Sequence, residues 1–203
     1  MAKHAGHDER RSAFAAAAFR ALAREGIAGL TVRNVAREAG FTTGALVHYY
    51  PSKNQLFLAA SEHAAYVVRP RMEQDEVAYG GLEGLRRVIY DALPTTAEAR
   101  DLWSVWLVFW DRAKTDPVIG ALAQERYSEW HGRLERLIRR AQDDGLIAQT
   151  ADAGLLAQMA IVLVDGIAIQ TLRTSARLSA KRQRAMIDTW IANLPAPKRR
   201  PQA

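Results

Sequence analysis

Residues 31–53 read TVRNVAREAGFTTGALVHYYPSK, and this stretch decides the fold. It contains two short helical patterns, over 31–39 and 43–50, with Gly40 between them. Thr31 caps the first pattern and Thr42 or Thr43 caps the second, because a threonine hydroxyl accepts a hydrogen bond from an unpaired N–H of the first turn. Gly40 readily adopts the left-handed backbone conformation and ends the first helix after about two turns. Two short helices joined by a glycine turn are typical of a helix-turn-helix.

A helix-turn-helix of this size matches the major groove of double-stranded DNA. The groove is about 12 Å wide and admits one helix, whose N-terminal residues then face the base edges. Short side chains around Gly44 let the backbone approach the DNA, while His48, Tyr49 and Lys53 offer donors to the phosphates. Arg33, on the first turn of the preceding helix, reaches the other side of the groove. The predicted DNA-binding residues are Thr31, Arg33, Thr42, Thr43, Gly44, Ala45, His48, Tyr49 and Lys53.

The segment before this motif predicts one more helix, which completes a three-helix domain. Residues 8–25 carry an apolar stripe that includes Phe14 and Phe19 at helical spacing. Gly26 is placed to end this helix, as the residue that follows its last turn. We therefore place the DNA-binding domain at residues 8–53.

The remainder of the chain is also helical, because no stretch alternates with a period of two residues. Ser52 begins a capping box that opens a long helix, and Thr95 begins a second one. Further helices are predicted over 83–93, from Pro117 to about Asp144, from Thr150 or Asp152 to about Leu172, and from Ser179 to before Pro195. The sequence thus predicts an all-α fold of about nine helices.

The net charge of +6 is unevenly distributed along the chain. Residues 1–53 hold eight Lys/Arg and four Asp/Glu, residues 54–197 are nearly balanced, and Lys198, Arg199 and Arg200 follow. A basic first part on a near-neutral remainder suits a partner that is polyanionic at one end only. A solvated basic surface without a partner would give the same pattern, so charge alone leaves both interpretations open.

Several function classes are excluded by what the sequence lacks. It has no cysteine, which excludes a disulfide framework, a thiolate metal site and a cysteine nucleophile. It has no P-loop, no G-x-S-x-G and no dinucleotide-binding glycine motif, so we expect no enzyme activity, no cofactor and no metal site. The longest apolar runs, 13–19 and 159–164, are shorter than the ~18 residues that span a bilayer, and residues 1–12 hold no signal-peptide core. We expect a cytoplasmic protein without membrane contact.

Residues 10–58, RRSAFAAAAFRALAREGIAGLTVRNVAREAGFTTGALVHYYPSKNQLFL, resemble the DNA-binding domain of the TetR family of bacterial transcriptional regulators. The resemblance rests on Gly26, the LTVRNVAREAG segment, the TTGALVHYY helix and the PSKNQLF start of the next helix. Val47 departs from the family pattern, since members often have tyrosine there. Tyr50 stands where phenylalanine is commoner, and we expect it to keep a packing role.

The second half is similar to the C-terminal domain of the BetI-like branch of that family, over residues 102–147 and 155–172. The resemblance implies a homodimer that binds a palindromic operator as a repressor. It also implies that a small molecule in the C-terminal domain releases the dimer from DNA. We accordingly predict a DNA-binding domain at 8–53, a helical effector-binding and dimerisation domain at 54–194, and a basic disordered tail at 195–203.

The sequence itself also indicates a dimer through the last two helices, 152–173 and 179–194. These helices carry more apolar surface than one small domain needs to cover. One stripe contains Leu155, Met159, Val162, Leu163 and Gly166, and another contains Met186, Trp190 and Leu194. Pairing both helices with their twofold mates makes a four-helix bundle. An internal core would use the same stripes, so periodicity leaves that alternative open.

Aromatic residues mark a candidate ligand site in the second domain. Trp103, Trp106 and Trp110 share one face of a helix, with Asp111 or Glu62 as nearby acids. Such a cluster would hold a cation by cation–π attraction, and the BetI-like resemblance points to quaternary ammonium or polyamine-like effectors. Plain core packing, with His63 as a hydrogen-bonded core residue, is the alternative. The predicted ligand-binding residues are His63, Tyr66, Trp103, Trp106, Trp110, Tyr127 and Trp130.

Three hypotheses therefore stand after the sequence is read. The first is a repressor that responds to a small-molecule effector. The second is a dimeric DNA-binding regulator without an effector, which a filled aromatic core would favour. The third is a helical ligand-binding protein or enzyme in which residues 10–58 only pack. The third requires acidic screening of the 42–53 surface, and the charge distribution has the opposite sign.

Overall fold

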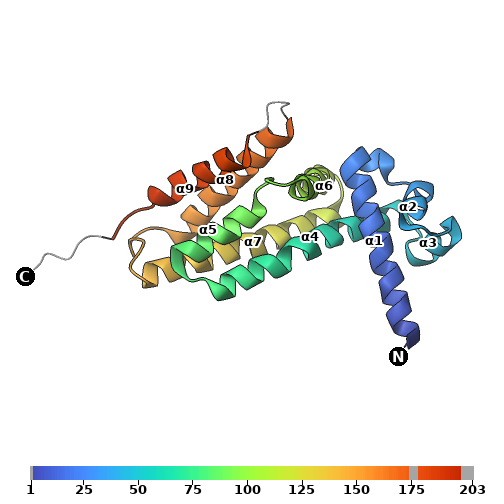
Figure 1. Ribbon diagram of the computed structural model, residues 1–203, viewed down its shortest axis with the longest axis horizontal. Coiled ribbons are helices and arrows are strands. Elements are labelled where there is room, and N and C mark those ends of the chain that lie inside the picture. The colour runs from blue at the N-terminus through green and yellow to red at the C-terminus, as the bar shows by residue number, and fades with distance from the viewer. Residues whose placement is uncertain (1, 174–177, 198–203) are drawn as a thin grey trace, which may run out of the picture. The chain divides into compact units, whose positions relative to one another are not determined.

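The computed structural model describes residues 2–173 and 178–197, with side chains from His7 onward. Within these residues it contains nine helices and no strand (Figure 1). The helices are α1 (Ala2–Gly29), α2 (Val32–Ala39), α3 (Thr43–Tyr49), α4 (Lys53–Ala78), α5 (Gly81–Ala92), α6 (Ala97–Ala113), α7 (Pro117–Asp143), α8 (Ala153–Arg173) and α9 (Ala180–Ala192). The predicted all-α fold of about nine helices is confirmed. Most of the tail predicted at 195–203 lies outside the described residues.

The chain divides into two compact units that do not follow chain order. Unit 1 comprises Met1–Val67 and Arg100–Gly120, and unit 2 comprises Val68–Ala99 and Ala121–Ala203. Because α4, α6 and α7 each contribute residues to both units, packing divides the chain differently from the predicted 8–53 and 54–194. Those domain boundaries remain a prediction.

The first helix is broken at Gly26, where φ is 62° and ψ is −157°. The main helix therefore ends before Gly26 as predicted, and a short helical segment continues to Gly29. The start differs from the prediction, because the helix begins at Ala2 rather than near Asp8. Residues 2–7 contain no proline, serine, threonine, aspartate or asparagine, so no capping residue starts the helix within them.

The helix-turn-helix has the predicted caps. The Thr31 hydroxyl accepts a hydrogen bond from the Asn34 N–H at 3.2 Å, and the Thr42 hydroxyl accepts one from the Ala45 N–H at 3.2 Å. Thr42 rather than Thr43 is thus the cap of α3, which ends at Tyr49. Gly40 has a left-handed φ of 73° and ends α2, as the sequence predicts.

Unit 1 joins α1 to the two short helices through apolar packing and ion pairs. Glu38 of α2 forms ion pairs with Arg20 at 2.9 Å and with Arg24 at 3.3 Å. The hydrogen bond from Arg20 is the main cause that lowers the pKa of Glu38. Tyr50 is nearly buried, and its hydroxyl donates to the Arg11 carbonyl at 3.3 Å, in agreement with its expected packing role. The largest fully buried side chains of this unit are Phe14, Leu22, Leu30, Leu46, Leu56, Phe57, Phe109 and Ile119.

Unit 2 packs α5 against α8 and α9. Asp188 of α9 accepts hydrogen bonds from the Tyr90 hydroxyl at 2.6 Å and from Arg86 Nε at 3.0 Å, both on α5. Capping differs from the prediction at α6, because the Thr96 hydroxyl accepts the Ala99 N–H at 3.1 Å. Thr96 rather than Thr95 is thus the cap, since it directly precedes Ala97, the first residue of α6.

Of the described helices, α8 is the one that is long and apolar enough to cross a membrane, with a mean hydropathy of 1.8 over 18 residues. This helix was not singled out by the length of uninterrupted apolar runs, because Asp165 and polar residues interrupt its apolar sequence. Length and composition alone are weak evidence, since core helices of soluble proteins meet the same criterion. About 44% of that window is buried within the chain. The rest includes four exposed apolar residues: Leu155, Met159, Val162 and Ile169.

Candidate DNA-binding site and effector-domain residues

The short helix α3 has one side that faces solvent. Its four exposed residues are Thr43, Gly44, Val47 and His48, whose spacing of one and four positions places them on one face. Leu46, on the other side, is fully buried. The helix therefore presents a small, mostly polar face that unit 1 does not cover.

Two threonines that cap helices are also exposed, namely Thr31 and Thr42. In each cap the hydroxyl oxygen accepts a backbone N–H, which leaves its own O–H to donate elsewhere. Phosphate oxygens only accept hydrogen bonds. Each threonine is thus equipped to hold its helix and to bind a phosphate at the same time.

Gly44 has no role in the packing of the chain. A Cβ atom added there would meet no atom within 4 Å, and its φ is not in the left-handed region. Glycine inside a helix lowers stability by roughly 0.5–1 kcal/mol relative to alanine. The fold itself therefore does not require glycine at this exposed position of α3.

The other predicted DNA-binding residues divide by exposure. Arg33, His48 and Lys53 are exposed, whereas Ala45 and Tyr49 are half-buried. The Tyr49 ring lies 5.4 Å from the Phe14 ring and 5.5 Å from the His48 ring, between centroids. Packing against α1 therefore fixes the direction of Tyr49.

Arg37, one turn after Arg33 on α2, was not among the predicted DNA-binding residues, although it is also a candidate by position. Arg37 is exposed, and its Nη2 donates to the Asn34 side chain at 2.6 Å. Asn34 is itself anchored, because its Nδ2 donates to the Gly29 carbonyl at 2.8 Å. The spacing of four residues from Arg33 was the available signal, since such residues share a helix face.

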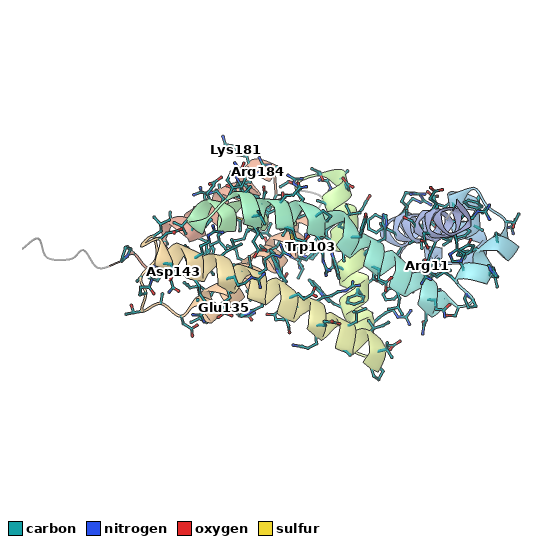
Figure 2. All side chains as sticks on the ribbon, turned by 90° about the horizontal axis from the view of Figure 1, so that it is seen from below. Arg11, Trp103, Glu135, Asp143, Lys181 and Arg184 are labelled. Atoms are coloured by element: carbon teal, nitrogen blue, oxygen red, sulfur yellow. The ribbon has the colours of Figure 1, made fainter. Side chains whose placement is uncertain are left out.

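The tryptophans predicted as ligand contacts lie on α6 and only partly come together. Trp103 (Figure 2) is buried, and its ring lies 5.7 Å from that of Trp110 in an edge-to-face arrangement. Trp106 lies edge-on to Phe109 at 5.5 Å, and Phe109 stacks on Phe57 at 6.1 Å. The aromatic cluster of α6 thus includes Phe109 and, from α4, Phe57, which the list of predicted ligand contacts left out.

The two predicted contacts on α4 differ from each other. His63 is half-buried with its ring 5.5 Å from that of Phe19, and burial, with the charge of Arg20 second, lowers its pKa. This environment agrees with the core alternative for His63. Tyr66 is 74% exposed on the chain.

In unit 2 the predicted contacts are Tyr127 and Trp130 of α7, both half-buried. The Tyr127 hydroxyl donates to the Gln158 side chain on α8 at 2.6 Å. This hydrogen bond shows which edge of α8 is turned toward α7. Gln158 was not among the predicted residues.

The acids that the sequence suggested for a cationic ligand are not buried. Glu62 and Asp111 are exposed, and Asp111 forms an ion pair with Lys114 at 2.7 Å. Both stand on outward faces of their helices, which aromatic spacing alone does not reveal.

A different acid, Asp165 in the middle of α8, is partly buried and was not predicted from the sequence. It is half-buried, and it forms neither an ion pair nor a hydrogen bond with any described side chain. Burial alone raises its pKa to about 6. It stands seven residues, about two turns, after Gln158 and therefore on the same face of α8. The available signal was an acid inside an otherwise apolar helix.

Comparison with known families decides the class. Residues 15–60 match the family described as bacterial regulatory proteins, tetR family. Residues 81–196, more than half of the chain, match the family described as BetI-type transcriptional repressor, C-terminal. The chain belongs to the TetR family. It is therefore a DNA-binding transcriptional regulator, of a family whose members in general are not enzymes.

Relatives of this TetR-family chain extend over almost its whole length. The transcriptional regulator PksA of Bacillus subtilis is 27% identical over 96% of this chain and 94% of its own. The regulator BetI of Burkholderia mallei is 25% identical over 98% of this chain and all of its own. A transcriptional regulator from Saccharomonospora viridis, solved in complex with choline, is 28% identical with a TM-score of 0.85, covering 92% and 97% of the two chains. A Rhodococcus regulator at 22% identity, with a TM-score of 0.79, shares the fold.

Proposed function

We propose that this TetR-family regulator is a repressor that binds a palindromic operator as a homodimer and is released by a small organic cation. The observation that carries operator binding is the exposed face of α3, where Gly44 has no packing role. The exposed cap hydroxyls of Thr31 and Thr42 support phosphate contacts on either side of that face. Action on bacterial DNA also supports the cytoplasm as its location.

A homodimer is supported by the surface of α8. Leu155, Met159 and Val162 are 58%, 47% and 60% exposed, and Ile169 continues the same stripe. A Cβ at Gly166 would meet no atom of the described residues within 4 Å, apart from its own helix backbone, which leaves room for a second helix to approach. A two-turn helix makes too few contacts to select a site alone, whereas two copies about 34 Å apart read successive major grooves. The interface we propose is formed by residues 152–173 and 179–194 of both copies.

A cationic effector is supported by two independent observations. The Saccharomonospora viridis relative was solved with choline, a quaternary ammonium. This chain carries a half-buried acid, Asp165, whose charge no described residue balances. Within unit 2, Asp165 is added to the predicted ligand contacts Tyr127 and Trp130, because it shares a face of α8 with Gln158, which accepts a hydrogen bond from Tyr127. Asp165 would balance the charge of the cation, and aromatic faces would attract it by ~0.5–2 kcal/mol per contact.

Release from the operator requires that the effector prefer a conformation with low DNA affinity. Helix α4 begins at Lys53, a proposed phosphate contact, and also carries His63 and Tyr66. We propose that the effector shifts the equilibrium between two orientations of this helix, one with high and one with low affinity for DNA. A change from mostly bound to mostly released needs a differential affinity of up to ~5.5 kcal/mol between the two states.

Selection of genomic fragments on the purified protein, at about 0.15 M salt, tests this function. We expect a palindromic sequence to be recovered and to be bound by a dimer. Choline and related ammonium compounds are then titrated into the complex, and operator affinity is expected to fall. Equal affinity at all effector concentrations would favour a dimeric regulator without an effector. Recovery of no specific sequence by well-folded protein free of bound small molecules would contradict operator binding.

A further inference from the structure

Val47 is an apolar side chain that α3 turns toward solvent. It is 43% exposed, and it shares the outward face of the helix with Thr43, Gly44 and His48. Leu46, its neighbour in the chain, is fully buried and supplies the core contact of this turn. Val47 is the residue of that face with a large apolar side chain and no hydrogen-bonding group. On a protein surface that meets DNA, such a side chain needs an apolar partner.

The major groove offers one projecting apolar group, the C5 methyl of thymine. Cytosine presents only a flat C5–H edge, and the remaining groove positions are hydrogen-bond donors and acceptors, with which a valine cannot pair. Placing valine against those polar edges would remove water from them without replacing its hydrogen bonds. Contact with a methyl group instead removes apolar surface from water on both sides.

Gly44 makes this contact feasible for a short side chain. It lies three residues before Val47 and has no Cβ, and a Cβ placed there would meet no described atom within 4 Å. Close approach of the helix backbone at Gly44 carries the neighbouring turn toward the base edges. A valine, which extends only two bonds beyond its Cα, can then reach the base itself.

We propose that Val47 reads a thymine methyl in each half-site of the operator and so sets the base preference at that position. This inference rests on the proposed operator binding. Thr43, one turn earlier on the same face, reads the adjacent position through its hydroxyl or methyl group. Val47 is thus a specificity residue, and its removal changes which base is preferred more than how strongly DNA is held.

The test removes the methyl from the DNA and the valine from the protein, separately and together. In the operator recovered by selection, each thymine is replaced in turn by deoxyuridine, which differs only by the methyl group. Wild-type protein is expected to lose about fourfold in affinity at one position of one half-site, and about fifteenfold when both half-sites are changed. Val47→Ala is expected to bind the two DNAs equally. Val47→Thr, which keeps the shape and one methyl, is expected to retain part of the preference.

Several results would overturn the inference. One is wild-type binding that is indifferent to deoxyuridine at every position, and another is a Val47→Ala variant with the same deoxyuridine sensitivity as wild type. The exposed position predicts an unchanged melting temperature for Val47→Ala, so a folding defect can be separated by thermal unfolding. If neither protein binds any sequence specifically, the proposed function itself fails and this inference falls with it. Specific binding without methyl sensitivity leaves the proposed function intact and refutes the role of Val47.

Discussion

The α2–α3 region and helix α8 differ in whether residues of the same chain cap their backbone groups, cover their apolar surface and balance their charges. In α2 and α3 each first turn is capped by a threonine of the same segment, and the turn between them contains a left-handed glycine. In α8 an apolar stripe stays exposed, and Asp165 has no counter-ion among the described residues. The first region is complete as a folded unit and needs a partner only for function. The second leaves apolar surface exposed and a partly buried acid without a described counter-ion, which a second copy would cover in the proposed dimer.

The largest expected effect on oligomeric state and operator affinity comes from a charge placed within the exposed apolar stripe of α8. Val162→Glu places a charge at the centre of the exposed stripe, where the proposed second copy would bury it without a partner. Because Val162 is 60% exposed, the chain itself is expected to stay folded. We expect a monomer in analytical ultracentrifugation and an operator affinity at least ~10²-fold lower, since the two half-sites are then bound independently.

Val118→Glu is the matched control for that variant. Val118 is 69% exposed on α7 and lies outside the stripe, so the same change is expected to leave both dimer and operator affinity unaltered. A Val162→Glu protein that remains dimeric would show that α8 is not the interface. Association with lipid vesicles in place of a dimer would assign the apolar stripe to a membrane surface instead.

The next effect concerns Gly44, where stability and binding are expected to change in opposite directions. Gly44→Ala fits the free chain without a clash and raises the free energy of unfolding by roughly 0.5–1 kcal/mol, because alanine favours a helix. The same methyl group would hold the backbone away from DNA, so we expect operator affinity to fall about tenfold or more. Denaturant unfolding and fluorescence anisotropy measure the two quantities.

Gly132→Ala serves as the control for the backbone effect. Gly132 is inside α7, and a Cβ there would meet Arg136 at 3.6 Å, an ordinary contact. It is expected to gain similar stability with no change in DNA affinity. Unchanged operator affinity in Gly44→Ala would show that DNA does not approach this glycine closely.

Asp165→Asn tests the uncompensated charge of α8. Burial raises the native pKa of Asp165 to about 6, while an unfolded aspartate titrates near 4. Between about pH 4 and 6 the native state therefore binds more protons than the unfolded state, so stability falls as pH rises through this window. The asparagine variant lacks the part of this dependence that comes from Asp165, and at pH 7 we expect it to be more stable by about 2 kcal/mol.

The same variant is expected to weaken the response of operator binding to choline. The two effects must be read together, since a stabilised protein that keeps its full response would show that Asp165 does not bind the effector. Chemical unfolding at several pH values, with choline titration of the operator complex at pH 7, supplies both. Burial also raises the pKa of Asp91 to about 6, so Asp91 contributes a similar slope of stability against pH. Asp91 is present in both proteins, and the difference between their slopes therefore belongs to Asp165.

Features of the two regions that depend on neighbouring residues could be predicted from the sequence, and features that depend on distant helices could not. The caps at Thr31 and Ser179 and the left-handed Gly40 are local features, since a residue and its neighbours within four positions determine them. The Thr95 cap was wrong because Thr96 offers the same hydroxyl one position later, and the sequence alone does not fix whether the helix begins at 96 or at 97. Asp165 was missed because its burial depends on helices distant in sequence, which no local pattern contains.

The smallest expected effect separates phosphate contacts from base contacts on the completed surface. Lys53→Ala removes one exposed charge, so binding to all DNA sequences should weaken by a similar factor. The slope of log affinity against log salt should also fall by about one or less for each protein copy. Thr43→Ala should instead alter which bases are preferred and leave the salt slope unchanged. Affinity measured for the operator and for unrelated DNA at several salt concentrations distinguishes them. If both variants change only the slope, α3 positions the protein on the phosphates, and base selection must lie in other residues such as Arg33 or Arg37.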